Sequence, residues 1–198
     1  MTVQIFYKNN DNSSNQVLFV EENYNINTIK KHVSSADLSY IKEILKNNDL
    51  KKQILSLDLN SKKRLILVSI KKKLESSDIE NLGADFYNYI KGRNINKLSI
   101  ISNTLNSRSE KDFIGHFLHG LKLKSYEFNI YKTKKEKKII LINVIGKKNN
   151  LTIKNELKFK ALEEGTFFTR DLVSEPGNIL HPDEYAKRLI KLKKYGLK

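Results

Sequence analysis

The sequence predicts an α/β protein in which a mixed sheet is flanked by helices, and two observations support this class. Short apolar runs alternate with amphipathic segments from 64 to 131, the order that packs crossover helices on a sheet. Several runs are continuous stretches of β-branched residues and leucine, which is typical of strands covered on both faces. With 198 residues the chain can form one medium domain with additional elements.

Seven segments have the length and composition of strands. They are VQIFY at 3–7, QVLFVE at 16–21, QILSLD at 53–58, RLILVSI at 64–70, KLSIIS at 97–102, YEFNIY at 126–131 and KIILINVI at 138–145. The polar stretch 9–16 predicts a surface loop or hairpin connection near the start of the chain.

Three helices are expected between the strands. In the segment that ends at Gly92, Ser77 and Glu80 have capping-box spacing, and glycine is suited to the helix end. Ser109 is expected to cap the next helix, and a weaker helix is expected over 38–48. The expected buried stripes are Ile79, Leu82, Phe86 and Ile90 in the first helix, Phe113, Phe117 and Leu121 in the second, and Leu38, Ile41 and Leu45 in the third.

A long helix is predicted from Thr152 to about Val173, followed by a shorter one. Ala161 and Gly165 lie one turn apart and leave a shallow groove where another backbone can approach. Pro176 disfavours helix at the residue before it, and Pro182 suits the first turn of the next helix, which we expect to end at Gly196. The expected stripe of the long helix is Ile153, Leu157, Ala161, Gly165, Phe168 and Leu172.

Composition excludes several classes of protein. No cysteine occurs, which removes disulfides, thiolate nucleophiles and cysteine-based zinc sites. The first residues lack the basic and apolar regions of a signal peptide, and no apolar window of about 18 residues exists to span a bilayer. We therefore expect a cytoplasmic protein with no membrane partner.

The net charge of +15 is concentrated after residue 60, because seven lysines balance seven acids in 1–60. The candidate basic patch comprises Lys132, Lys134, Lys135, Lys137, Lys138, Lys147 and Lys148. Such patches attract nucleic-acid phosphates. However, only five of the 37 basic residues are arginine, the residue suited to two-pronged recognition of phosphate and guanine. We prefer a solvated lysine surface, and a nucleic-acid-binding module is the alternative.

The residues show no catalytic arrangement. His116 and His119 share a helix face, as metal ligands can. However, neither has an acidic neighbour of the HExxH kind, and Phe113, Phe117 and Leu121 are expected to occupy the buried side of the helix. Adjacent acids such as Glu163 and Glu164 point apart on a helix. The chain also lacks G-x-G-x-x-G and G-x-S-x-G motifs. We expect no metal or cofactor in this chain.

Two segments resemble the leucyl (cytosol) aminopeptidase family. TRDLVSEPGNILHPDEYA at 169–186 resembles the family connector A/T-R-D-L-x-N-E-P-x-N-x-L-T-P-x-x-x-A, from which Ser174 and His181 depart. GLKLKSYEFNIYKTKKEK at 120–137 resembles the family segment G-x-x-L-x-S-Y-x-F-x-x-Y-K-T-K. The matching connector positions are Arg170, Asp171, Leu172, Glu175, Pro176, Asn178, Leu180, Pro182 and Ala186.

The resemblance implies a macro-domain-like α/β domain at 1–150 and a connector helix at 151–175. It also implies that 176–198 begins a catalytic domain absent from this chain. In the family, two divalent metals, zinc or manganese, activate water to remove N-terminal residues from peptides, and the subunits form hexamers. The metal ligands would all follow Lys198. We therefore expect an inactive chain that serves scaffolding and assembly, with the missing catalytic domain or full-length subunits as partners.

Overall fold

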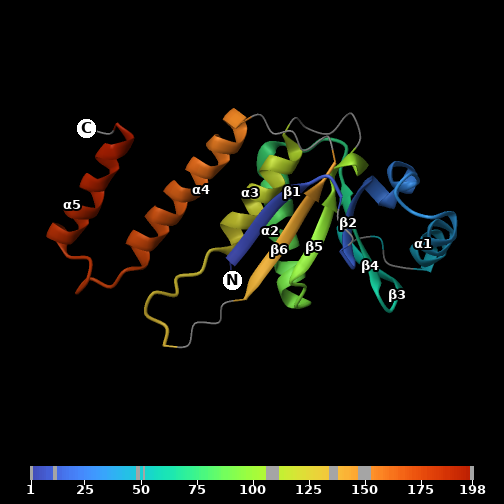
Figure 1. Cartoon of the computed structure of the whole chain (residues 1–198), viewed down its shortest axis with the longest axis horizontal. Helices are drawn as coiled ribbons and strands as arrows, with labels where there is room; N and C mark the ends of the chain where they lie inside the picture. The colour runs from blue at the N-terminus through green and yellow to red at the C-terminus, as the bar shows by residue number, and fades with distance from the viewer. Residues whose placement is uncertain are drawn as a thin grey trace.

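The apolar runs form a six-stranded mixed sheet with the strand order β1-β6-β5-β2-β4-β3 (Figure 1). The computed structural model describes residues 2–10, 13–47, 50, 52–105, 112–133, 138–146 and 153–196. All neighbouring strands are parallel except β3, which is antiparallel to β4. The strands are β1 (Thr2–Lys8), β2 (Asn15–Glu21), β3 (Ile54–Asn60), β4 (Lys63–Ile70), β5 (Lys97–Ile101) and β6 (Ile139–Ile145). The predicted α/β class is confirmed.

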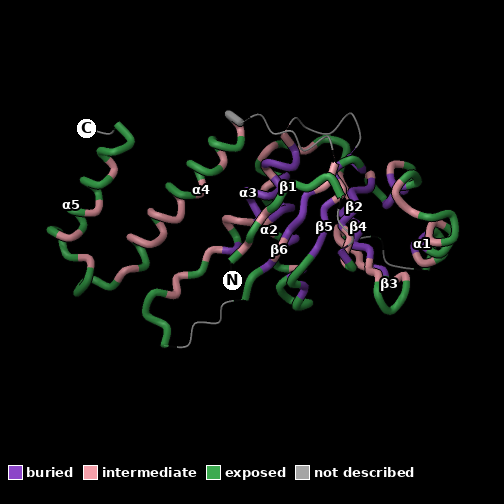
Figure 2. Tube along the Cα trace, viewed as in Figure 1, coloured by how far each residue is buried: buried purple, intermediate pink, exposed green. Residues whose placement is uncertain are grey.

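The central strands are covered on both faces, as their continuous apolar runs predicted. In β2, Val17 and Phe19 point to one face and Leu18 and Val20 to the other, and all four are buried. The first face packs against α2 (Ser76–Gly92) and α3 (Phe113–Ser125), and the second packs against α1 (Ser35–Asn47) and the short turn η2 (Ile26–Ile29). Figure 2 shows that the buried residues concentrate in the sheet and in α2 and α3.

Two glycines let α2 and α3 approach closely. A Cβ atom on Gly83 would lie 2.0 Å from the carbonyl oxygen of Phe117, and one on Gly120 would lie 1.9 Å from the carbonyl oxygen of Glu80. Both distances are far inside van der Waals contact, so only glycine fits at these crossings. The close approach also places side chains of α2 and α3 beside one another, which matters for the histidine cluster described below.

One predicted strand is wrong. The segment 126–131 follows α3 and forms neither strand nor helix. Its alternating aromatic residues gave it a strand-like pattern, but Tyr126 packs its ring on Phe167 of the helix α4 (Ile153–Ser174), with 5.2 Å between centroids. Tyr126 therefore faces a helix instead of a neighbouring strand.

The predicted start of α2 is also wrong. Glu75 is the N-cap residue, and its backbone N–H donates to the carboxylate of Asp78 at 3.1 Å. The capping pair therefore lies two residues before Ser77 and Glu80, and the side chain of Glu80 is free to contact α3. The helix does end at Gly92, as predicted. Ser109, the expected cap of the next helix, lies outside the described residues, and α3 begins at Phe113.

The long helix α4 ends at Ser174, one residue before Glu175, as Pro176 predicted. The next helix, α5 (Pro182–Ile190), starts with Pro182 in its first turn and is continued by the 3-10 turn η5 (Lys191–Tyr195), which Gly196 ends in a left-handed conformation. Among the described helices, none combines the length and the apolar composition needed to cross a membrane.

The predicted buried stripe of α4 is wrong at Leu157, Ala161 and Gly165. Leu157 is 61% exposed, Ala161 is exposed, and a Cβ atom on Gly165 would meet nothing within 4 Å. The residues that contact the domain are instead Asn155, Phe159, Glu163, Phe167 and Asp171. Phe159, Glu163 and Phe167 each follow a predicted stripe residue by two positions, about 200° around the helix axis, so Leu157, Ala161 and Gly165 face away from the domain, whereas Phe168 and Leu172 of the predicted stripe are half-buried.

Candidate functional site: the anchored connector

The two segments that resemble the aminopeptidase family contact one another. The Tyr126 hydroxyl donates a hydrogen bond of 2.7 Å to Oδ1 of Asp171, and Nη1 of Arg170 donates one of 2.5 Å to the carbonyl oxygen of Leu123. The Arg170 guanidinium also lies 5.5 Å from the centre of the Tyr126 ring. Burial and the Asp171 hydrogen bond together raise the pKa of Tyr126, so the hydroxyl stays protonated and donates. These contacts fix the second half of α4 to the end of α3.

Glu175 joins the next two parts of the chain. Its Oε1 accepts a hydrogen bond of 3.0 Å from Nη1 of Arg188 on α5, and its Oε2 accepts one from the Tyr131 hydroxyl. The Glu175 side chain is only 4% exposed. The hydrogen bonds from Tyr131 and Arg188 hold the pKa of this carboxyl below its ordinary value. Glu175 therefore links the 126–131 segment, the turn after α4 and helix α5.

The remaining connector residues shape the turn between the helices. The carbonyl oxygen of Pro176 accepts hydrogen bonds of 2.9 Å from the backbone N–H groups of Ile179 and Leu180. Asn178 is exposed within this turn, Leu172 is half-buried on α4, and Pro182 begins α5. The structure thus places Arg170, Asp171 and Glu175 in anchoring contacts, whereas Pro176 and Pro182 shape the backbone of the turn and of the start of α5.

The first half of α4 is held by contacts that the sequence did not indicate. Nζ of Lys122 donates a hydrogen bond of 2.8 Å to Oε2 of Glu163, and Nδ2 of Asn155 donates one of 2.6 Å to Asp112. The ring of Phe159 lies 5.0 Å from that of His116 and 5.4 Å from that of His119. No described side chain of α4 or α5 is buried, so these individual contacts, rather than a large apolar interface, hold the connector.

His116 and His119 share an acidic neighbour from another helix, although neither has one of the HExxH kind in sequence. Oε1 of Glu80 on α2 lies 3.1 Å from Nδ1 of each histidine. Burial raises the pKa of Glu80, but the hydrogen bonds from the two histidines outweigh it and lower that pKa overall. The acid was missed because it is 36 and 39 residues away in sequence. Within the described ranges, no group of three or more histidine, aspartate or glutamate side chains has an arrangement that could hold a metal.

The candidate basic patch is only partly described. Lys132 and Lys138 are exposed, whereas Lys134, Lys135, Lys137, Lys147 and Lys148 lie outside the described residues. The nucleic-acid alternative therefore stays a prediction.

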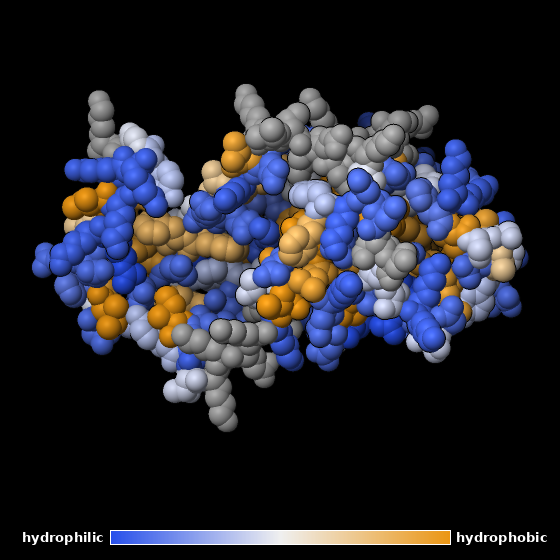
Figure 3. Space-filling view, viewed as in Figure 1, coloured by the Kyte–Doolittle hydropathy of each residue, from blue (hydrophilic) through white to orange (hydrophobic). Residues whose placement is uncertain are grey.

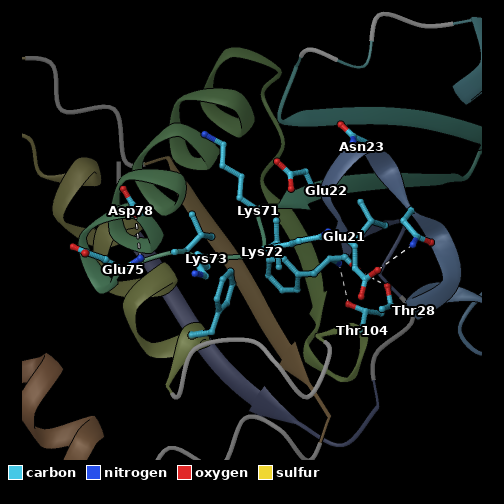
Figure 4. A pocket seen from close by; sticks show the side chains of 16 residues that line it. Glu21, Glu22, Asn23, Thr28, Lys71, Lys72, Lys73, Glu75, Asp78 and Thr104 are labelled. Carbon is cyan, nitrogen blue, oxygen red and sulfur yellow. Dashed lines mark hydrogen bonds between the residues drawn. The ribbon is translucent and has the colours of Figure 1, made fainter.

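A cavity of about 1010 Å³ lies at the carboxyl ends of β2 and β4 (Figure 4). The chain leaves β2 toward the α1 face and β4 toward the α2 face, a switch point where α/β proteins often bind ligands. Side chains of both charges line the cavity. The basic ones are Lys71, Lys72 and Lys73, and the acidic ones are Glu21, Glu22, Glu75 and Asp78. The first turn of α2 is already capped by Asp78. The cavity therefore offers no net positive field for a phosphate group.

The fold and the anchored connector define a class of protein: an α/β domain that carries a helical connector along one edge. Residues 17–135 match the Cytosol aminopeptidase family, N-terminal domain, and the chain belongs to this family. A cytosol aminopeptidase of Rickettsia prowazekii is 31% identical over 137 residues, which are 66% of this chain and 27% of that protein. A relative from Nitrobacter winogradskyi that bears the same family name is 30% identical over 146 residues, 68% of this chain and 28% of the relative.

Solved structures show the same fold. A tomato leucine aminopeptidase variant superimposes with a TM-score of 0.68 at 17% identity, over 98% of this chain and 43% of that protein. The bottromycin maturation enzyme BotP, solved in complex with Mn, gives a TM-score of 0.62 at 12% identity, over 93% of this chain and 37% of BotP. The chain thus spans less than a third of the curated relatives above, and the superposition includes the connector as well as the sheet.

Proposed function

We propose that this chain is the N-terminal, non-catalytic portion of a metal-dependent leucyl aminopeptidase that removes N-terminal amino acids from peptides. The observation that carries the proposal is the anchoring of the connector motif. Arg170, Asp171 and Glu175 hold α4 and α5 through residues of the second family-like segment. Such contacts set the direction in which the chain leaves the α/β domain. The role of the chain is to position and help assemble a catalytic part.

The exposed apolar side chains of the connector support this role. Leu157, Leu162 and Val173 on α4 and Ile190 and Tyr195 after it are exposed, and Figure 3 shows hydrophobic side chains gathered on the α4 and α5 region. Gly165 leaves room for close approach of another backbone. Leu157 lies about 140° around the helix axis from Leu162 and about 160° from Val173, so the exposed apolar residues surround α4 and do not form a single face. We assign them to contacts with the catalytic part, which corresponds to the remaining length of the longer relatives.

The chemistry belongs to that other part. Two-metal peptide hydrolysis requires several carboxylates that converge on two ions about 3.5–4 Å apart. The described residues do not fit this requirement, since they contain no metal-binding group. Zinc or manganese would therefore be held by residues of the catalytic part. We also propose that the assembled protein is a cytoplasmic homo-oligomer, a hexamer as the family resemblance implies; the relatives' names support the cytoplasmic location.

The test is direct. Purified chain is incubated with leucine p-nitroanilide and manganese, and the release of p-nitroaniline is followed by absorbance. We expect no release above buffer. Metal-dependent turnover that co-purifies with the chain would overturn the assignment of a non-catalytic role.

A further inference from the structure

We infer that His116, Glu80 and His119 form a proton-sensitive latch that holds α4 against the α/β domain. The inference rests on the proposed function only in treating α4 as a connector. Its core is geometric: one carboxylate oxygen of Glu80 lies 3.1 Å from Nδ1 of both histidines. Phe159 of α4 lies against both imidazole rings, 5.0 and 5.4 Å away between centroids.

The arrangement fits neutral histidines. With a proton on each Nδ1, both rings donate to Oε1 of Glu80, which can accept two hydrogen bonds. Nε2 of His119 is then unprotonated. This atom is buried and has no hydrogen-bond partner among the described residues, and the His119 side chain is only 7% exposed. His116, at 17% exposed, is more accessible.

Protonation of His119 disrupts this arrangement. The imidazolium carries a second N–H at Nε2, and a buried donor without an acceptor is unfavourable. If His116 is protonated as well, two cations share one carboxylate, and they repel each other. Movement of α4 away from α3 removes Phe159 and opens both rings to water, so the released state accommodates protons more readily. A state that binds more protons is favoured as the pH falls.

The charged groups around the latch do not supply the missing acceptor. Glu163 is paired with Lys122 at 2.8 Å, and Glu164 lies 4.0 Å from Lys160. The groups that line the same 240 Å³ cavity as His119 are Tyr7 on β1, Lys122 on α3, and Glu156, Lys160, Glu163 and Glu164 on α4. None of these described groups forms a hydrogen bond with Nε2. Burial, with a smaller effect of Glu156, raises the pKa of Tyr7 to about 12, so Tyr7 stays neutral throughout.

The experiment measures the distance between α4 and α2. The chain has no cysteine, so spin labels can be placed at Asn88→Cys on α2 and Lys158→Cys on α4, both exposed and outside the latch. Pulsed electron spin resonance is recorded at about pH 7.5 and about pH 5.5, which spans the ordinary titration of histidine. We expect one narrow distance at the higher pH and, at the lower pH, an increase of about tenfold in the population at longer distances.

Three variants identify the groups responsible. His119→Asn keeps a donor near the Nδ1 position but cannot titrate, and we expect it to abolish the pH response. His32→Asn, which removes a histidine on the far side of the sheet, should leave the response unchanged. His116→Asn provides a second, more exposed substitution at the latch in case His119→Asn does not fold, and it should reduce the response. A distance distribution that does not change with pH, or an equal change in His119→Asn, would overturn the inference, and neither result would affect the proposed function.

Discussion

The hydroxyl of Tyr126 donates a 2.7 Å hydrogen bond to the carboxylate of Asp171, which lies 45 residues further along the chain. This contact joins the end of α3 to the second half of the connector, and it explains why two distant segments of the sequence carry family-like motifs. Each segment is the binding surface of the other. A change at either residue should therefore loosen the connector without disturbing the sheet.

Replacement of Tyr126 by phenylalanine tests this contact. The variant retains the ring that packs on Phe167 but removes the hydrogen bond to an ionised carboxylate, which is worth about 1.5–3 kcal/mol. We expect the amides of α4 to exchange with deuterium roughly tenfold faster or more, while the amides of α2 keep their protection.

Tyr40→Phe is a matched control, because the Tyr40 hydroxyl lies on the exposed surface with only a 3.5 Å contact to the carbonyl oxygen of Asp58. Equal exchange rates for α4 in Tyr126→Phe and Tyr40→Phe would show that the anchoring contact contributes nothing.

A second prediction concerns the crossing of α2 and α3. Gly120→Ala places a methyl group 1.9 Å from the carbonyl oxygen of Glu80, and the helices must separate to accommodate it. We expect a loss of about 3 kcal/mol or more in the free energy of unfolding, measured by urea titration.

Gly165→Ala is the control for helix propensity, because the new methyl group meets nothing within 4 Å. It should stabilise the chain by about 0.5–1 kcal/mol. If both alanine variants have the same stability, the close approach of α2 and α3 is not as described.

A third prediction concerns pH and Glu80. Burial raises the pKa of Glu80, but the hydrogen bonds from His116 and His119 lower it by a larger amount. The pKa of Glu80 is therefore below its ordinary value of 4.5. A carboxyl whose pKa is lowered by folding stabilises the protein above its unfolded pKa and loses that contribution as the pH falls through the folded pKa. The stability difference between the wild type and Glu80→Gln should therefore be full above about pH 5 and shrink as the pH falls below about 4.5.

Urea titrations at a series of pH values measure this difference. Glu164→Gln, whose carboxylate is exposed and only 4.0 Å from Lys160, should have no comparable effect. A difference that grows as the pH falls below about 4.5 would have the wrong sign for the described pair.

A fourth prediction separates the two helices of the connector. Glu175→Gln weakens the ion pair with Arg188 but leaves the contacts of Asp171 and Arg170 in place. We expect faster amide exchange in α5, with α4 unchanged. Exchange that increases equally in both helices would show that α4 and α5 are held as one unit.

Much of the fold could be predicted because the central strands are covered on both faces. The runs at 64–70 and 138–145 are mostly apolar, so burial of their central residues on both sides followed directly. Pro176 and Pro182 marked the helix ends through their own backbone restrictions. The strand predicted at 126–131 was wrong because an alternating pattern does not show whether the residues pack against a strand or against a helix. The buried stripe predicted for α4 was wrong at Leu157, Ala161 and Gly165 because the apolar face of a helix can contact a partner outside the described residues.

The candidate site was predictable only where it followed a family motif. Arg170, Asp171 and Glu175 were found from the motif, but their partners Leu123, Tyr126, Tyr131 and Arg188 required the structure. The histidine cluster depends on the close crossing of α2 and α3, which brings Glu80 to residues far along the chain. Sequence spacing assigned Glu80 to a helix cap, a local role that Asp78 fills instead.

We propose that peptide cleavage depends on residues outside this chain. Isothermal titration calorimetry of the purified chain with zinc and with manganese tests it most directly. We expect no saturable binding in the micromolar range or below with either ion. Two tight sites per chain would contradict it.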